Sequence, residues 1–163
     1  MSTYLRVPLA AAPASVRRAR EVVRSWLVDV GRSNTEYVAA QIVTELTTNA
    51  VVHAHGPVVL HLWCRRDGVR IGVSDGSTEL PRLTSEDPSA ASGRGLHLVD
   101  RLASRWDSDV HERGKITWAE ITHDLDAGAE TVTLPVLDGA ARPARWHLGW
   151  RGEGARRATA PDR

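Results

Sequence analysis

Three polar residues in the stretch "TELTTNAVVHAHG", residues 44–56, stand four positions apart and could handle phosphate and metal chemistry: Glu45, Asn49 and His53. Residues at i and i+4 share one face of a helix, so the three would form a polar ladder opposite an apolar face. Carboxylate and amide oxygens suit Mg²⁺, and a carboxylate can also accept a proton from an attacking hydroxyl. The alternative interpretation is the solvated face of an amphipathic helix.

A second candidate is Asp75, which ends the alternating run "VRIGVSD" at residues 69–75. Alternate residues of a strand point to the same side, so Asp75 would share a face with Ile71 and Val73. A carboxylate at the edge of an apolar pocket needs hydrogen-bond donors, and the amino group of adenine is one. Alternatively, Asp75 starts a turn with Gly76 and Ser77.

The third candidate is "SGRGLHLV", residues 92–99, where Gly93 and Gly95 precede a predicted helix. Glycines let the backbone approach an anion, the free N–H groups of the first helical turn point toward it, and Arg94 adds charge. A G-x-G pattern is weak by itself. The stretch has neither the lysine of a P-loop nor the preceding strand of a dinucleotide fingerprint.

Hydrophobic periodicity predicts the elements that must position these residues. A strand at 3–9 is followed by helices at 15–31 and 33–54, the second with Ser33 and Glu36 spaced as a capping box. Two alternating runs flank a hairpin turn at Asp67 and Gly68. A long polar loop at 76–92 precedes a third helix at 93–106 and a second strand pair ending near residue 124. This order predicts an α+β or mixed α/β sandwich, with helices on one face of a mainly antiparallel sheet.

Composition limits the class of protein. A chain of 163 residues with net charge +1 and no basic stripe favours one soluble domain and argues against direct nucleic-acid binding. We expect no membrane span and no signal peptide. A single cysteine, Cys64, favours a reducing, cytoplasmic location. We place the domain at residues 1–126, and residues 127–163, rich in Ala, Gly, Pro and Arg, read as a largely flexible C-terminal extension.

In this order and spacing, the three motifs resemble the N, G1 and G2 boxes of the GHKL (Bergerat-fold) ATPases. The phrase "ELTTNAVVHAHGP...VSDGS...P...SGRGLHLVDRLASRW" is similar to the small bacterial anti-sigma regulatory factors that act as serine/threonine protein kinases, over residues 12 to 122. The resemblance implies a Bergerat fold with ATP and Mg²⁺ as cofactors, and an ATP lid from Gly76 to Ser92. A homodimer would also match the family.

The resemblance also assigns roles to residues. Glu45 would be the general base, Asn49 would hold Mg²⁺, and Asp75 would accept the adenine amino group. Nucleotide-binding roles fall on Asn49, His53, Asp75, Ser77, Gly93, Arg94, Gly95, Leu96 and Thr117. The implied reaction is phosphoryl transfer from Mg·ATP to a serine or threonine of a small STAS-type anti-sigma-factor antagonist. The implied outcome is sequestration of a sigma factor when that antagonist is phosphorylated.

The sequence departs from the family pattern at three points. Ser77 and Glu79 replace the two glycines of D-x-G-x-G, although small anti-sigma-like members often carry a D-x-S variant. Ala90 replaces the leading glycine of G-x-x-G-x-G, and the late G-T element is blurred, with Thr117 displaced behind Lys115 and Ile116. The departures leave nucleotide binding as the expectation and weaken the case for turnover.

Two other functions remain open. One is a non-catalytic, nucleotide-gated protein-binding module built on the same pocket. The other is a metal site made from His53, His55, His61 and Cys64, which we disfavour because this spacing fits no common zinc pattern. Cys64 itself is better interpreted as a small buried residue than as a nucleophile.

Overall fold

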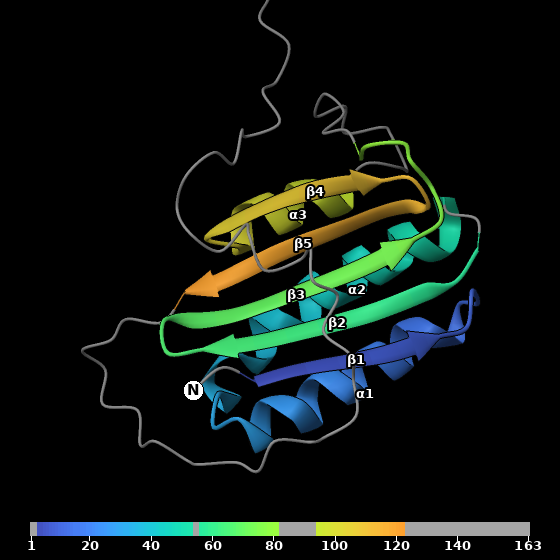
Figure 1. Ribbon diagram of the computed structural model, residues 1–163. Helices are drawn as coiled ribbons and strands as arrows, with labels where there is room; N and C mark the ends of the chain where they lie inside the picture. Colours follow the sequence, from blue (N-terminus) through green and yellow to red (C-terminus); the bar gives the residue numbers. More distant parts are fainter. Residues whose placement is uncertain (1–2, 54–55, 82–93, 123–163) are drawn as a thin grey trace, which may run out of the picture.

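The computed structural model describes residues 3–53, 56–81 and 94–122 (Figure 1). The predicted order of elements is confirmed. In chain order they are β1 (Thr3–Leu9), α1 (Ala14–Asp29), a 3₁₀ turn η1 (Ser33–Thr35), α2 (Glu36–His53), β2 (Val58–Arg65), β3 (Gly68–Asp75), α3 (Arg94–Leu102), β4 (Arg105–His111) and β5 (Gly114–Thr122). No helix within these ranges combines the length and apolar character that a bilayer span requires.

The five described strands form one sheet in the order β1-β2-β3-β5-β4, and each neighbouring pair is antiparallel. All three helices lie on the same side of this sheet (Figure 1). The predicted fold class, an α/β sandwich of two layers, is therefore confirmed. Because β3 and β5 are neighbours, the start of β5 lies beside the end of β3, where Asp75 stands.

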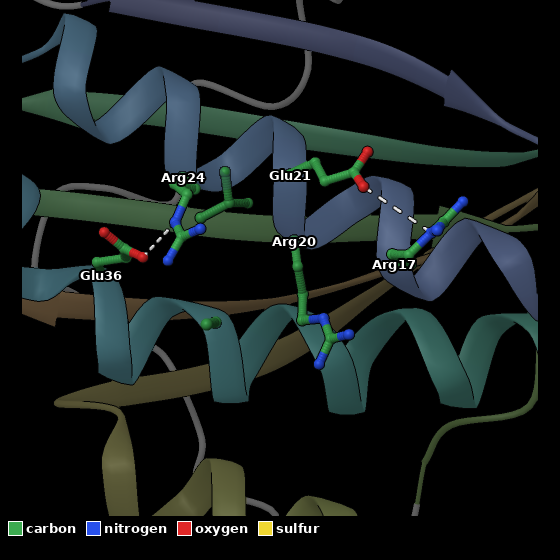
Figure 2. A pocket seen from close by; sticks show the side chains of 7 residues that line it. Arg17, Arg20, Glu21, Arg24 and Glu36 are labelled. Carbon is green, nitrogen blue, oxygen red and sulfur yellow. Dashed lines mark hydrogen bonds and ion pairs between the residues drawn. The ribbon is translucent and has the colours of Figure 1, made fainter.

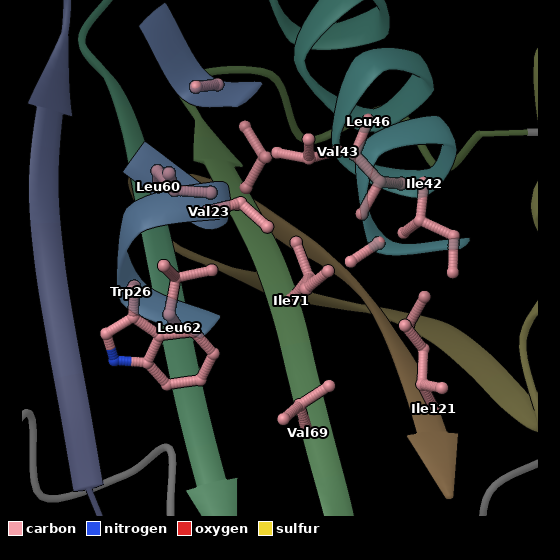
Figure 3. Close-up of a cluster of buried hydrophobic side chains, with 14 of the residues drawn as sticks. Val23, Trp26, Ile42, Val43, Leu46, Leu60, Leu62, Val69, Ile71 and Ile121 are labelled. Carbon is pink, nitrogen blue, oxygen red and sulfur yellow. The ribbon is translucent and has the colours of Figure 1, made fainter. Parts of the chain in front are cut away.

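The helix-facing side of the sheet carries the apolar core. Leu60 and Leu62 of β2 and Ile71 of β3 are fully buried beneath α1 and α2 (Figure 3). Their helical partners include Val23 and Leu46, which point toward the sheet from the two helices. The alternation of β3 therefore sets which of its side chains meet the helices, and Asp75 lies on their side as the pattern predicts.

The opposite side of the sheet, which we call the outer face, carries aromatic and charged side chains. Tyr4, His61 and Trp63 stack on one another, with ring centroids 5.2 to 6.2 Å apart. Farther along the face, the Arg70 guanidinium lies 4.0 Å from the ring centroid of Trp118 and donates to Glu120. The polar groups of this face are thus bonded to one another across neighbouring strands.

Two predicted boundaries were wrong. The second helix was expected to begin at Ser33 with a capping box, but Ser33 starts the 3₁₀ turn, and Glu36 instead accepts a 2.5 Å hydrogen bond from Arg24. The third helix ends at Leu102 instead of Trp106, because residues from Arg105 onward pair with β5. The gain from pairing with β5 outweighs the helical periodicity of the last residues.

Because the sequence contains no Phe, we expect Trp26, Trp106 and Trp118 to be core residues, and the structure divides them. Trp26 lies among the buried residues of α1, and Trp106 packs against that cluster. Trp118 is buried as well, but on the outer face, because it pairs with Gly72 and not with a core position of β3. The extension at 127–163 lies outside the described residues.

Candidate functional site

The polar ladder of α2 is only partly exposed. The helix buries its apolar face against the sheet and α1 through Ala39, Ile42, Val43, Leu46, Thr47 and Ala50. Glu45 and Asn49 are half-buried beside this face, whereas His53 at the end of the helix is exposed. A solvated face would leave all three exposed, so the alternative interpretation fits only His53.

The carboxylate of Glu45 lies against the first turn of α3. A Cβ atom built on Gly95, the second residue of that helix, would overlap the Glu45 carboxylate and lie 3.2 Å from its Cδ. A Cβ atom at this position would therefore have to displace the Glu45 carboxylate, which is the movable end of a flexible side chain. The first-turn N–H groups of a helix carry partial positive charge and bind anions. Glu45 of the ladder and Gly95 of the G-x-G motif, about fifty residues apart in sequence, thus meet.

Asp75 is buried at the end of β3, on the helix-facing side of the sheet. Its Oδ1 accepts a 2.8 Å hydrogen bond from the backbone N–H of Ser77, which is the turn that the alternative interpretation predicted. Ser77 in turn accepts a hydrogen bond from the N–H of Glu79. The carboxylate of Asp75 therefore stabilises the turn.

Lys115 is the second partner of Asp75 and was missed by the sequence reasoning as a site residue. The two residues pair across β3 and β5, and Lys115 Nζ donates to Asp75 Oδ1 at 2.9 Å. The backbone at Gly114 approaches so closely that a Cβ there would overlap the Asp75 carbonyl. The signal that could have found Lys115 is its status as the only lysine of the chain.

The remaining predicted residues fall into two groups. Thr117 lies on the helix-facing side, where it is buried and its hydroxyl is 2.8 Å from that of Ser108. Leu96 is buried in α3. Gly93 lies outside the described residues, as does the lid from residue 82 onward, and of Arg94 only the backbone at the start of α3 is described.

The side-chain oxygens of the described residues fit a Mg²⁺ ion that is also bound to phosphate. Within the three described ranges, no group of three or more His, Cys, Asp or Glu side chains is arranged to hold a metal. Mg²⁺ needs no such cage, because it commonly takes one or two protein oxygens together with water and phosphate oxygens. Glu45 and Asn49 supply oxygens one helical turn apart, and the Gly95 cradle lies beside Glu45.

The rival metal site finds no support in the described geometry. His61 lies on the outer face, with its ring nitrogens 2.8 Å from the Tyr4 hydroxyl and 2.9 Å from Ser74 Oγ. Cys64 is buried on the helix-facing side of the same strand, as predicted for a small core residue. Burial raises the pKa of the Cys64 thiol, which disfavours both metal ligation and nucleophilic attack.

A pocket of about 330 Å³ lies elsewhere, between α1 and the first half of α2 (Figure 2). Its rim is charged, with Arg24 paired to Glu36 and Arg17 paired to Glu21 at 3.8 Å. Glu36 begins α2, two turns and more before Glu45, so this pocket belongs to the opposite end of the helix from Asn49. It contains none of the residues singled out by the three motifs.

Comparison with known proteins agrees with this geometry. Residues 9–121 match the family described as histidine kinase-like ATPase domain. This match spans more than half of the chain and includes all three motifs, so the protein belongs to the histidine kinase-like ATPase domain family. Domains of this kind bind ATP, usually with Mg²⁺. A search of curated proteins found no match.

Proposed function

We propose that this protein is an anti-sigma-type regulatory kinase. It binds Mg·ATP, phosphorylates a serine or threonine of a STAS-type antagonist, and sequesters a sigma factor when the antagonist is phosphorylated. The observation that carries the proposal is the contact between Glu45 and the first turn of α3 at Gly95. It brings a carboxylate that can act as a base beside a helix terminus that suits phosphate.

The roles follow from the chemistry of each group. Asn49 offers an amide oxygen to Mg²⁺, which neutralises phosphate charge when bound, and the N–H groups of the first turn of α3 orient the phosphates. The oxygen of the substrate hydroxyl forms a bond to the γ-phosphorus of ATP, and ADP leaves. Glu45 accepts the proton that the hydroxyl loses. Asp75 accepts a hydrogen bond from the amino group of adenine. Phosphoryl transfer depends mainly on positioning and charge, so these few polar groups are sufficient.

Phosphoryl transfer from γ-labelled ATP to purified STAS-domain proteins tests the assignment of the base. Glu45→Ala should abolish transfer and retain ATP binding by calorimetry. Gln41→Ala is the matched control, because Gln41 is half-buried one turn earlier on the same helix and should transfer at the wild-type rate. Normal transfer by Glu45→Ala would show that another group is the base.

A second candidate function is a non-catalytic, nucleotide-gated binding module. It is favoured by the replaced glycines at Ser77 and Glu79, together with the engagement of Asp75 by Lys115. In that case the wild type would bind its partner only with ATP and would transfer no label to it. Glu45→Ala would then bind the partner as the wild type does.

A further inference from the structure

Lys115 occupies an unusual position for a lysine. Its side chain is 10% exposed and that of Asp75 is 4% exposed, so both charges are removed from water at the end of β3. Burying an ion pair rarely adds net stability, because desolvation offsets the attraction between the charges. A pair of apolar residues would serve the fold equally well. Stability alone therefore does not account for the pair, and the observation that bears on function is its position at the turn where Ser77 donates to Asp75.

The pair presents two kinds of hydrogen-bonding group side by side. Asp75 and Lys115 are directly opposite in the β3–β5 register, so their side chains project from the same side of the sheet. The carboxylate only accepts hydrogen bonds, whereas the ammonium has three N–H donors, of which one is directed at Asp75. An acceptor and a donor thus lie 2.9 Å apart.

This spacing suits the edge of one nucleobase. Adenine carries an amino donor next to a ring-nitrogen acceptor, N1. We infer that Lys115 is a specificity-determining residue of the nucleotide site, whose ammonium donates to N1 of the base while Asp75 accepts from its amino group. The inference rests on the proposed nucleotide function. Guanine bound in the same orientation would place its O6 acceptor against the carboxylate and its N1–H donor against the ammonium. Neither contact would then be a hydrogen bond.

The backbone holds this pair in place. Gly114 packs directly on the Asp75 carbonyl, where no Cβ would fit. The backbone N–H of Ser77 donates to the Asp75 carboxylate and holds it in place. Lys115 follows Gly114 at the start of β5, so its Cα position is set by the same contact. A recognition group that is fixed before binding loses little entropy on binding.

Calorimetric titration of the wild type with Mg²⁺ complexes of ATP, 1-deaza-ATP, purine riboside triphosphate and GTP tests the inference. 1-deaza-ATP lacks only the N1 acceptor, so we expect it to bind about ten- to a hundredfold more weakly than ATP, as for loss of a hydrogen bond to a charged group. Purine riboside triphosphate lacks only the amino group, so any loss of affinity relative to ATP measures the hydrogen bond to Asp75 separately. GTP should bind more weakly than either analogue.

The variant Lys115→Met completes the test. It should bind ATP and 1-deaza-ATP equally, each with the affinity of the wild type for 1-deaza-ATP. Arg70→Met is the matched control, because it removes the other buried cation of the same two strands on the outer face and should keep the wild-type ratio. Circular dichroism verifies folding, and the analogue series in the wild type stands alone if Lys115→Met fails to fold.

The outcomes separate the two proposals. If ATP binds and 1-deaza-ATP binds equally well, the inference about Lys115 is wrong and the proposed function stands. If Lys115→Met retains the preference for ATP over 1-deaza-ATP, another group reads N1. If the wild type binds no ATP, the proposed function fails and the inference fails with it.

Discussion

Two buried ion pairs join β3 to β5, one on each side of the sheet. On the outer face, both Nε and Nη2 of Arg70 donate to Glu120, and Trp118 lies against the guanidinium. On the helix-facing side, Lys115 makes one hydrogen bond to Asp75 at the end of the strand. Register alone puts each pair together. The two pairs differ in their surroundings, because the outer pair lies among aromatic and charged side chains of the sheet and the other pair lies at the turn that follows β3.

The outer pair is fully engaged by its neighbours. Arg105 approaches Glu120 at 3.6 Å and lies 5.1 Å from the Trp118 ring centroid, while the indole N–H of Trp118 donates to Asp109. Asp75 and Lys115 instead stand next to the turn in which the backbone N–H of Ser77 donates to Asp75. The comparison predicts that changes on the outer face alter stability, and that changes on the helix-facing side alter nucleotide binding.

The largest expected effect is on the outer pair. Glu120→Gln should lower the free energy of unfolding by about 3–5 kcal/mol, because it removes the carboxylate that pairs with a buried guanidinium. Urea denaturation measures this loss. The double variant Arg70→Met/Glu120→Leu removes both charges and should stay close to the wild type. If the single and double variants lose the same free energy of unfolding, the loss does not come from leaving a buried guanidinium unpaired.

The next effect concerns His61 on the same face. Burial, aided by Arg6, lowers the pKa of His61 to about 4 from its usual 6.5. The folded state therefore keeps His61 neutral while the unfolded state binds a proton below pH 6.5. Stability is full above pH 6.5 and falls as the pH drops toward 4, by on the order of 3 kcal/mol at most.

Urea midpoints between pH 7.5 and 4.5 measure the dependence on His61. His61→Gln should flatten this part of the profile, although its stability at pH 7.5 also falls through the lost contacts with Tyr4 and Ser74. The comparison therefore rests on the slope against pH. A variant slope equal to that of the wild type would assign the effect to other groups.

A smaller effect is expected at the contact between α2 and α3. Gly95→Ala should destabilise the fold by up to about 1.5 kcal/mol, because its Cβ would push the Glu45 carboxylate out of its present rotamer. Adding Glu45→Ala removes the overlapping group, so the double variant should recover most of the loss. Simple additivity of the two changes would show that the carboxylate does not lie against Gly95.

The smallest effect concerns Thr47, which is fully buried on α2 and whose hydroxyl has no hydrogen-bond partner among the described residues. Thr47→Val keeps the shape and removes the unsatisfied group, so it should stabilise the fold by about 1 kcal/mol. Thr44→Val is the matched control, because the Thr44 hydroxyl donates to the Ala40 carbonyl at 2.7 Å. The control should be neutral or destabilised, and equal gains in both would contradict the argument.

Sequence patterns predicted the features that depend on local periodicity. Alternation placed Asp75 on the helix-facing side, and i, i+4 spacing placed Glu45 and Asn49 on one face of α2. The same alternation set Trp118 and Glu120 apart from Ala119 and Ile121, so the outer position of Trp118 was available from the pattern. Expecting it in the core gave hydrophobicity more weight than strand parity.

Contacts between distant segments could not be predicted. The Asp75–Lys115 pair depends on the β3–β5 register, forty residues apart in sequence, and the Glu45–Gly95 approach depends on how α3 packs on α2. The capping box failed for a related reason, because Glu36 found a partner in Arg24 of another helix. Tertiary partners here replaced the local bonds that the sequence suggested.

The thermal midpoint with saturating Mg·ATP, for the wild type and Asp75→Asn, tests the central claim that the helix-facing end of β3 binds a nucleotide. At a ligand concentration about a hundred times Kd, binding adds about 2.7 kcal/mol and raises the midpoint by several degrees. We expect this rise in the wild type and in Glu120→Gln, and its loss in Asp75→Asn. An equal rise in Asp75→Asn, or no rise in the wild type, would contradict the account.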